Sequence, residues 1–181
     1  MVIGVFLAGC AHVDTQVFFS PRGGCEKKVV ELMTSATQTI DVAIYSLNNK
    51  AILESVKAAH KRGVKIRILL DRLQASGNRE ETLGIKQTGI DVRIHSVNKI
   101  QHNKFGIFDG KKVLTGSFNW TNSAEEANEE NCLISDDQEV VKAFKSRFSE
   151  HLWVVNTIEK SVATFKRLED AMKDLAVAGQ K

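Results

Sequence analysis

The sequence has a single proline and no low-complexity tract among its 181 residues, which leaves little room for a disordered linker. It contains no internal repeat, so any motif that it carries is present once. Its three cysteines are too few for a disulfide framework, and their spacing is not that of a zinc site. These absences exclude disordered, disulfide-framework and zinc-scaffold classes of protein.

The overall composition is that of a soluble globular protein. Hydrophobic residues make up 43% of the chain and charged residues 26%. A chain of this length is most naturally one domain. The formal net charge of +3 favours an anionic partner only mildly, so charge alone does not decide the function.

The N-terminal run MVIGVFLAGC is apolar but far shorter than the roughly 20 residues that span a bilayer. Small residues before Cys10 are typical of the end of a signal peptide, and LAGC resembles the lipobox of bacterial lipoproteins, in which the cysteine is acylated. We therefore treat residues 1–16 as a suspected leader remnant and linker and expect an exported, periplasmic protein, anchored to the membrane if Cys10 is lipidated. The positively charged n-region is missing, so a short strand in a cytoplasmic protein is the alternative.

The other two cysteines leave two alternatives open. Cys25 and Cys132 could pair with each other in an oxidising compartment. Two separately buried thiols would fit the sequence equally well.

Hydrophobic periodicity predicts alternating strands and helices. A strand, a helix and a second strand between residues 39 and 71 predict a βαβ crossover and therefore two parallel strands. A polar loop is predicted over 72–81. The predicted strands otherwise cover residues 90–96, 102–108, 111–116 and 131–135, and the predicted helices cover 25–37, 48–63, 80–88, 138–155 and a C-terminal extension over 156–181.

A β-hairpin is predicted between residues 102 and 116. Asp109 and Gly110 lie between two β-rich runs, and both tolerate the positive φ that a tight hairpin turn requires. Because Asp109 belongs to this turn, we expect it to have a structural role.

Four polar side chains lie at the open end of this hairpin. His102 and Lys104 are two residues apart on one strand and therefore share a face, as Ser117 and Asn119 do beyond the other strand. An imidazole, an ammonium, a hydroxyl and an amide together suit a phosphate, with one nucleophile or base and three hydrogen-bond donors. Each of these residues by itself is typical of an ordinary protein surface. The hypothesis of a phosphate site therefore rests on the arrangement of all four together.

The pattern His102-x-Lys104, Asp109 and Gly116-Ser117-x-Asn119 resembles the complete HKD motif of the phospholipase D superfamily. NEEN at 128–131 resembles the family's later Glu-Asn element. The similarity covers about residues 17–155 and is strongest to the bacterial endonucleases that carry one motif per chain. It implies an α/β fold in which a mixed sheet is flanked by helices on both faces, with residues 156–181 as an additional helix.

The resemblance also implies residue roles. His102 would attack phosphorus and form a phosphohistidine, while a second histidine protonates the leaving oxygen and then activates water. Lys104, Ser117 and Asn119 would stabilise the charge on the phosphoryl oxygens, and Glu130 would orient His102. Asp109 and Gly116 would be structural members of the motif. No metal or cofactor is implied.

The second histidine has to come from elsewhere, because the chain carries one motif. His95 lacks the following x-Lys and is a poor candidate. A homodimer with the active site on its twofold axis would supply the missing histidine. The leading hypothesis for the substrate is nucleic acid, cleaved with low sequence specificity; the alternatives are membrane phospholipid and, less favoured, a noncatalytic nucleic-acid-binding module.

Overall fold

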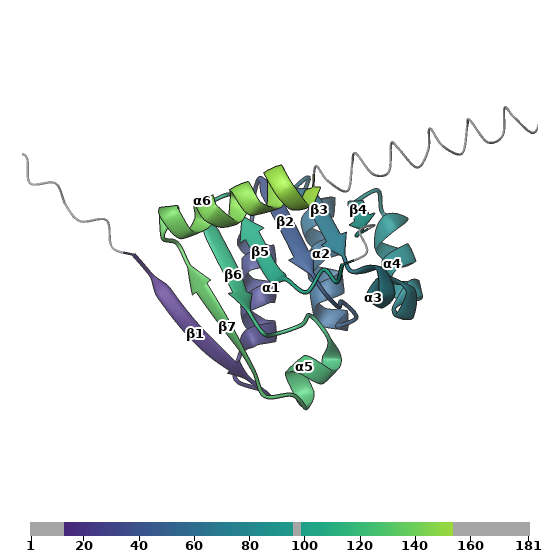
Figure 1. Ribbon diagram of the computed structural model, residues 1–181, viewed down its shortest axis with the longest axis horizontal. Coiled ribbons are helices and arrows are strands. Elements are labelled where there is room, and N and C mark those ends of the chain that lie inside the picture. The colour runs from purple at the N-terminus through teal and green to yellow at the C-terminus, as the bar shows by residue number, and fades with distance from the viewer. Residues whose placement is uncertain (1–12, 96–98, 154–181) are drawn as a thin grey trace, which may run out of the picture.

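Seven strands form one mixed sheet in the computed structural model, which describes residues 13–95 and 99–153 (Figure 1). The strand order is β1-β7-β6-β5-β2-β3-β4. The strands are β1 (Thr15–Ser20), β2 (Thr39–Ile44), β3 (Lys65–Leu70), β4 (Asp91–Ile94), β5 (Lys104–Phe108), β6 (Lys112–Gly116) and β7 (Glu130–Ser135).

The predicted βαβ crossover is confirmed. Strands β2 and β3 are parallel and are joined by α2 (Lys50–Lys61), and β4 continues the parallel half of the sheet. Asn49 caps α2 by accepting a hydrogen bond from the Ile52 N–H at 3.0 Å. The predicted hairpin of β5 and β6 is also confirmed, and it makes the other half of the sheet antiparallel together with β7 and β1.

Helices cover both faces of the sheet. Helices α1 (Cys25–Ser35) and α2 lie behind the sheet in Figure 1, and α6 (Gln138–Ser146) crosses its front. Alternation along β2 supplies both cores: Ile40, Val42 and Ile44 pack with α1 and α2, whereas Ala43 packs with Val141 of α6. The predicted mixed sheet with helices on both faces is therefore observed.

Residues 72–81 differ from the prediction of a polar loop. They form α3 (Arg72–Gly77) and the start of α4 (Arg79–Lys86). Helix α3 forms because the Asp71 carboxylate accepts hydrogen bonds from the N–H groups of Leu73 and Gln74, at 2.9 and 3.3 Å. The sequence also did not predict α5 (Asn122–Glu126), which follows β6.

The helix predicted over 138–155 is not continuous. Helix α6 ends at Ser146, and a π-helical turn follows over Arg147–Trp153. This turn is held to the sheet by Arg67, whose guanidinium lies 5.0 Å from the Phe148 ring centre and 5.3 Å from that of Trp153. Amphipathicity alone does not predict this local widening of the helix.

Strand β1 begins at Thr15, two residues before the predicted start of the domain at residue 17. Cys10 and the helix predicted over 156–181 lie outside the described residues. Within the described part of the chain, every helix is too short or too polar to cross a bilayer.

Cys25 and Cys132 form a disulfide, so pairing is the alternative that the structure selects. Their Cα atoms lie 5.9 Å apart, and the bond joins the first residue of α1 to β7 across 107 positions of sequence. A crosslink that closes so long a loop restricts the unfolded chain strongly.

We expect the double variant Cys25→Ser, Cys132→Ser to unfold with a free energy about 2–4 kcal/mol lower than that of the wild type. Urea unfolding, followed by circular dichroism with and without reductant, measures this difference. Reductant should lower the midpoint of the wild type and leave that of the double variant unchanged. If reductant leaves the urea midpoint of the wild type unchanged, that result would contradict the presence of the disulfide.

Candidate active site

The predicted site residues come from three neighbouring strands. His102 precedes β5, Ser117 and Asn119 follow β6, and Glu130 begins β7. Because β5, β6 and β7 pair antiparallel in this order, the start of β5, the end of β6 and the start of β7 meet at one end of the sheet. This is the end at which α5 lies in Figure 1, opposite α6.

The backbone around His102 is held on both sides. The Gln101 side-chain oxygen accepts hydrogen bonds from the backbone and side-chain N–H groups of Asn103, at 2.7 and 2.8 Å. The backbone N–H of Gln101 donates to Asp71 at 3.0 Å. The imidazole of His102 is exposed, so a fixed backbone presents it to solvent.

Lys104 is buried, in contrast to His102. Its Nζ donates a hydrogen bond to the His102 carbonyl oxygen at 2.8 Å. Burial lowers the pKa of Lys104 below its ordinary value, and the negative charge of Glu130 partly opposes this effect. A cation in such a position is less screened by water than a surface lysine, which strengthens its effect on a nearby anion.

One aromatic side chain touches both of these residues. The Tyr45 ring centre lies 4.6 Å from that of His102, and the Lys104 Nζ lies 4.9 Å from the Tyr45 ring centre. The Tyr45 hydroxyl accepts a hydrogen bond from Gln74 of α3 at 3.1 Å. The sequence-based predictions do not include Tyr45, Gln74, Asp71 or Gln101.

A sequence signal for two of them did exist. Tyr45 and Asp71 directly follow the parallel strands β2 and β3, and ligand contacts in open α/β sheets gather at such carboxyl ends. The contact of Tyr45 with His102 and that of Asp71 with Gln101 join residues that are distant in the chain. No local pattern in the sequence shows these contacts.

The chain beyond β6 turns sharply at Gly116. A Cβ at this position would collide with the carbonyl oxygen of Asn131, so the close approach of β6 to β7 requires glycine. Ser117 Oγ accepts a hydrogen bond from the Asn131 N–H at 3.1 Å. The buried Asn119 Oδ1 has no hydrogen-bond partner among the described residues.

Glu130 is placed near Lys104 but not against His102. Its Oε1 accepts a hydrogen bond from Asn128 at 3.2 Å, and among the hydrogen bonds of the described residues none joins it to His102. His95 directly follows β4, which is an edge strand of the sheet. Strands β2 and β3 lie between β4 and β5. The structure therefore does not bring His95 and His102 together by strand pairing.

Asp109 lies at the opposite end of the hairpin. Its carboxylate accepts hydrogen bonds from the backbone N–H groups of Thr37, Gln38 and Thr39, at 3.0, 2.8 and 2.9 Å. Burial by itself would raise the pKa of Asp109, but these bonds together lower it below the ordinary value. Asp109 thus ties the hairpin turn to the start of β2.

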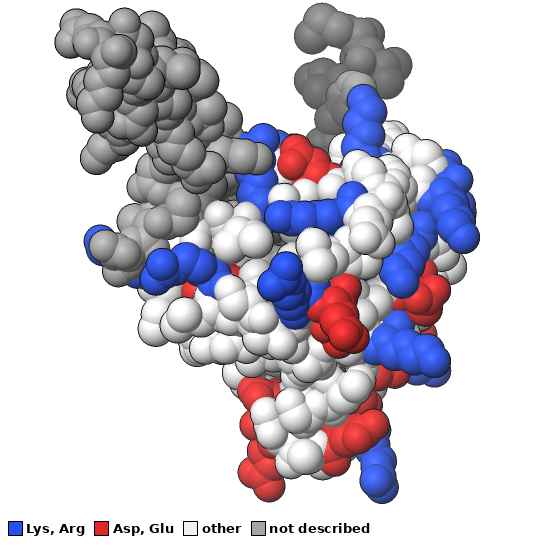
Figure 2. Space-filling model, turned by 90° about the vertical axis from the view of Figure 1, so that its right-hand side faces the viewer, with Lys and Arg blue, Asp and Glu red and all other residues white. Residues whose placement is uncertain are grey.

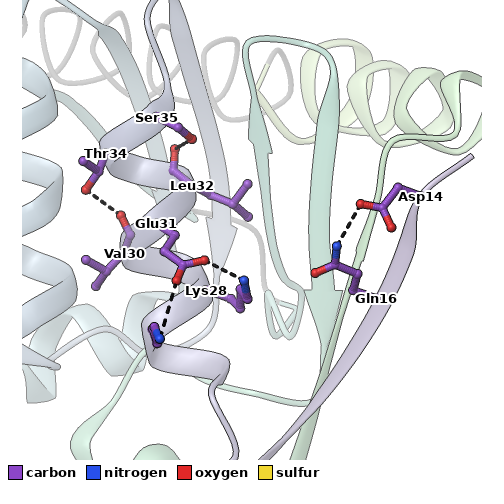
Figure 3. Close-up of polar contacts among 9 residues, drawn as sticks. Asp14, Gln16, Lys28, Val30, Glu31, Leu32, Thr34 and Ser35 are labelled. Carbon is purple, nitrogen blue, oxygen red and sulfur yellow. Dashed lines mark hydrogen bonds and ion pairs between the residues drawn. The ribbon is translucent and has the colours of Figure 1, made fainter.

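A separate cavity of about 280 Å³ lies between α1 and the β1–β7 edge. Figure 3 shows that two pairs of its polar side chains are engaged with each other: Lys28 pairs with Glu31 at 2.6 Å, and Gln16 donates to Asp14 at 2.8 Å. None of the motif residues lines it. We therefore assign the candidate site to the end of the sheet at which His102 lies.

Comparisons with known proteins show what the chain is similar to. The family model described as "Cardiolipin synthase, PLD-like domain" matches residues 29–153. A protein named phospholipase D from Rickettsia typhi is 37% identical over 126 residues, which are 70% of this chain and 62% of that protein. A mitochondrial cardiolipin hydrolase from Chlamydomonas reinhardtii is 35% identical over 145 residues, covering 80% of this chain and 64% of that protein. The chain thus spans less than two thirds of these relatives.

Two solved structures are similar over nearly their whole length. Nuc from Salmonella typhimurium, a phospholipase D family member, has a TM-score of 0.72 and 31% identity, and the match covers 78% of this chain and 95% of Nuc. NucT from Helicobacter pylori has a TM-score of 0.69 and 26% identity, with 78% of this chain and 96% of NucT covered.

Replacement of Asp109 by Asn should lower the free energy of unfolding by about 1–2 kcal/mol at neutral pH, because a charged acceptor is lost. The depressed pKa of Asp109 stabilises the fold above its unfolded-state pKa, and this contribution is lost as pH falls through the folded-state value. The difference in the free energy of unfolding between variant and wild type should therefore be smaller at acidic pH than at neutral pH. Urea unfolding at the two pH values measures this difference. Asp91→Asn, at an exposed carboxylate, is the control; an equal loss at both pH values would contradict the assignment.

Proposed function

The chain belongs to the phospholipase D superfamily, and we propose that it is a phosphodiester hydrolase of that superfamily, acting as an endonuclease of low sequence specificity. The observation that carries this proposal is the convergence of His102, Lys104 and Asn119 at one end of the sheet. The sequence resembles single-motif endonucleases, and the match extends over almost all of Nuc and NucT but under two thirds of the relatives named phospholipase D.

The proposed reaction has two displacements. An imidazole nitrogen of His102 attacks phosphorus, and the bond from phosphorus to the leaving oxygen breaks as that oxygen takes a proton from a second histidine. The same second histidine then removes a proton from water, and the resulting hydroxide attacks phosphorus and releases His102. The exposed position of His102 allows a phosphodiester to reach it.

Three side chains suit the negative charge that develops on the phosphoryl oxygens. Lys104 supplies an ammonium, Ser117 a hydroxyl and Asn119 an amide. The charge of Glu130 raises the pKa of Lys104 against the effect of burial and so favours the protonated form. These donors perform the task that a divalent metal performs in many phosphoryl-transfer enzymes, so the proposed reaction needs no metal.

The proposed active unit is a homodimer. Each chain offers one His102, and the two-step reaction needs two histidines on opposite sides of one phosphorus. An isologous contact around a twofold axis would bring the two copies of His102 to one substrate. The active site would then lie on that axis.

Contacts to phosphate carry no base information, which supports low sequence specificity. Figure 2 shows the side of the molecule on which β4, α3 and α4 lie: Lys and Arg side chains are spread over its upper half, and acidic side chains gather toward its lower end. This mixed surface, with a net charge of +3, would attract nucleic acid weakly and in a strongly salt-dependent manner.

Phospholipid is the second candidate substrate, because the structure places apolar side chains beside the site. Leu73 and Ile100 are 62% and 65% exposed. The Asp71 carboxylate accepts hydrogen bonds from the backbone N–H groups of Leu73 and of Gln101, which follows Ile100, so the two backbone segments meet at this carboxylate. Exposed aliphatic residues can enter the acyl boundary of a bilayer, and the relatives named phospholipase D and cardiolipin hydrolase favour this candidate as well.

We also propose that the protein works in an oxidising compartment. The disulfide between Cys25 and Cys132 supports this proposal, since such bonds persist in the periplasm and outside the cell. Export, with or without lipidation of Cys10, would bring the protein there.

Incubation with plasmid, single-stranded DNA, RNA and phosphatidyl lipids in excess EDTA separates the candidates. We expect cleavage of nucleic acid with the chelator present and a loss of at least about a hundredfold in turnover for His102→Ala. The matched control is His60→Ala, which removes a histidine on α2 far along the chain from the motif. Release of lipid head group alone would select the phospholipase, and retarded but uncut nucleic acid would select a binding module.

The dimer is tested by mixing inactive and active chains. The concentration of wild-type chains is held constant while the His102→Ala variant is added in increasing excess. Each mixed dimer would then carry a single His102, and the activity per wild-type chain should fall in proportion to the fraction of wild-type chains in the mixture. Serum albumin at the same concentration is the control. Activity that stays constant, or an active monomer in sedimentation at assay concentration, would contradict the proposal.

A further inference from the structure

Tyr45 lies directly after β2 and contacts both His102 and Lys104. Its ring is tilted by 59° against the imidazole of His102, with the ring centres 4.6 Å apart. The Lys104 Nζ lies 4.9 Å from the same ring centre. A single aromatic side chain therefore joins the proposed nucleophile to the buried cation.

The imidazole of His102 depends on this contact for its orientation. Among the hydrogen bonds of the described residues, none involves the His102 ring, whereas the backbone on both sides is fixed by Gln101 and Asn103. Packing against Tyr45 restricts the side-chain torsions that the backbone leaves free. A nucleophile that is held in place loses less entropy on reaching phosphorus.

The second contact acts on charge. A Lys ammonium within about 6 Å of an aromatic ring centre is attracted to the negative face of the ring, and the attraction is lost when the amine is neutral. The Tyr45 ring therefore favours the protonated form of Lys104, which is the form that stabilises a phosphoryl anion. Glu130 acts in the same direction from another strand, β7.

We propose that Tyr45 is a positioning residue of the active site, whose ring orients the His102 imidazole and favours the ammonium form of Lys104. This inference rests on the proposed role of His102 as nucleophile. The hydroxyl has a smaller part: it accepts a hydrogen bond from Gln74, which connects the ring to α3. The ring face, and not the hydroxyl, is the element on which the site depends.

The variants Tyr45→Phe and Tyr45→Leu separate these two parts. With bis(p-nitrophenyl) phosphate as a simple phosphodiester, Tyr45→Phe should keep kcat within about threefold, and Tyr45→Leu should lower kcat about 10- to 100-fold with KM little changed. The alkaline limb of the kcat profile should move to lower pH in Tyr45→Leu alone, because Lys104 then loses its proton more easily. Circular dichroism checks that both variants are folded.

A spectroscopic readout makes the test independent of turnover and of any folding defect in Tyr45→Leu. The chain contains one tyrosine, so 3-fluorotyrosine incorporated during expression labels Tyr45 alone. Its fluorine chemical shift should respond to the loss of the neighbouring imidazole, whose ring centre lies 4.6 Å away. The chemical shift should therefore change in labelled His102→Ala and stay at the wild-type value in labelled His60→Ala.

The outcomes distinguish this inference from the proposed function. If His102→Ala abolishes turnover while Tyr45→Leu keeps the wild-type kcat, or loses it with an unmoved alkaline limb, the inference on Tyr45 is overturned and the proposed function stands. A fluorine chemical shift that is unchanged in His102→Ala overturns the inference as well. Wild-type turnover in His102→Ala overturns the proposed function itself.

Discussion

The candidate site depends most on the hydrogen bonds that the buried carboxylate of Asp71 accepts. It accepts hydrogen bonds from three backbone N–H groups, two at the start of α3 and one at Gln101. A carboxylate that is 3% exposed would be costly without such partners, so the loop after β3 and the segment that enters β5 must fold around it. Two paths then lead to His102: through Gln101 to the backbone, and through Gln74 and Tyr45 to the ring.

The antiparallel half of the sheet contributes the remaining groups. The turn at Asp109 sets the register of β5 against β6, and the absence of a Cβ at Gly116 lets β6 approach β7 closely. Ser117 is thereby bound to Asn131, beside Glu130. The disulfide fixes β7 to α1 two residues beyond Glu130. Motif members that look structural in the sequence therefore position those that carry the chemistry.

Local patterns in the sequence predicted much of this arrangement, and long-range contacts account for the rest. Alternation identified the core strands, and Asn49 and the Asp109–Gly110 turn were recognisable because capping and turn chemistry are local. Helix α3 was read as a loop because its composition is polar, although the capping Asp71 was a usable signal. The contact of Arg67 with the π-helical turn and the pairing of the two cysteines join residues that are far apart in the chain, so no local pattern encodes them.

The exposed position of His102 and the buried position of Lys104 suit the different roles that we propose for them. In the proposed reaction the phosphorus atom of a large substrate has to reach His102, whose exposed ring lies against Tyr45. Lys104 acts through its charge, which is strongest where water is scarce, but the same burial favours the neutral amine. The Tyr45 ring and the charge of Glu130 oppose that loss from two sides. The groups around Lys104 are therefore as much a part of the site as the motif that identifies it.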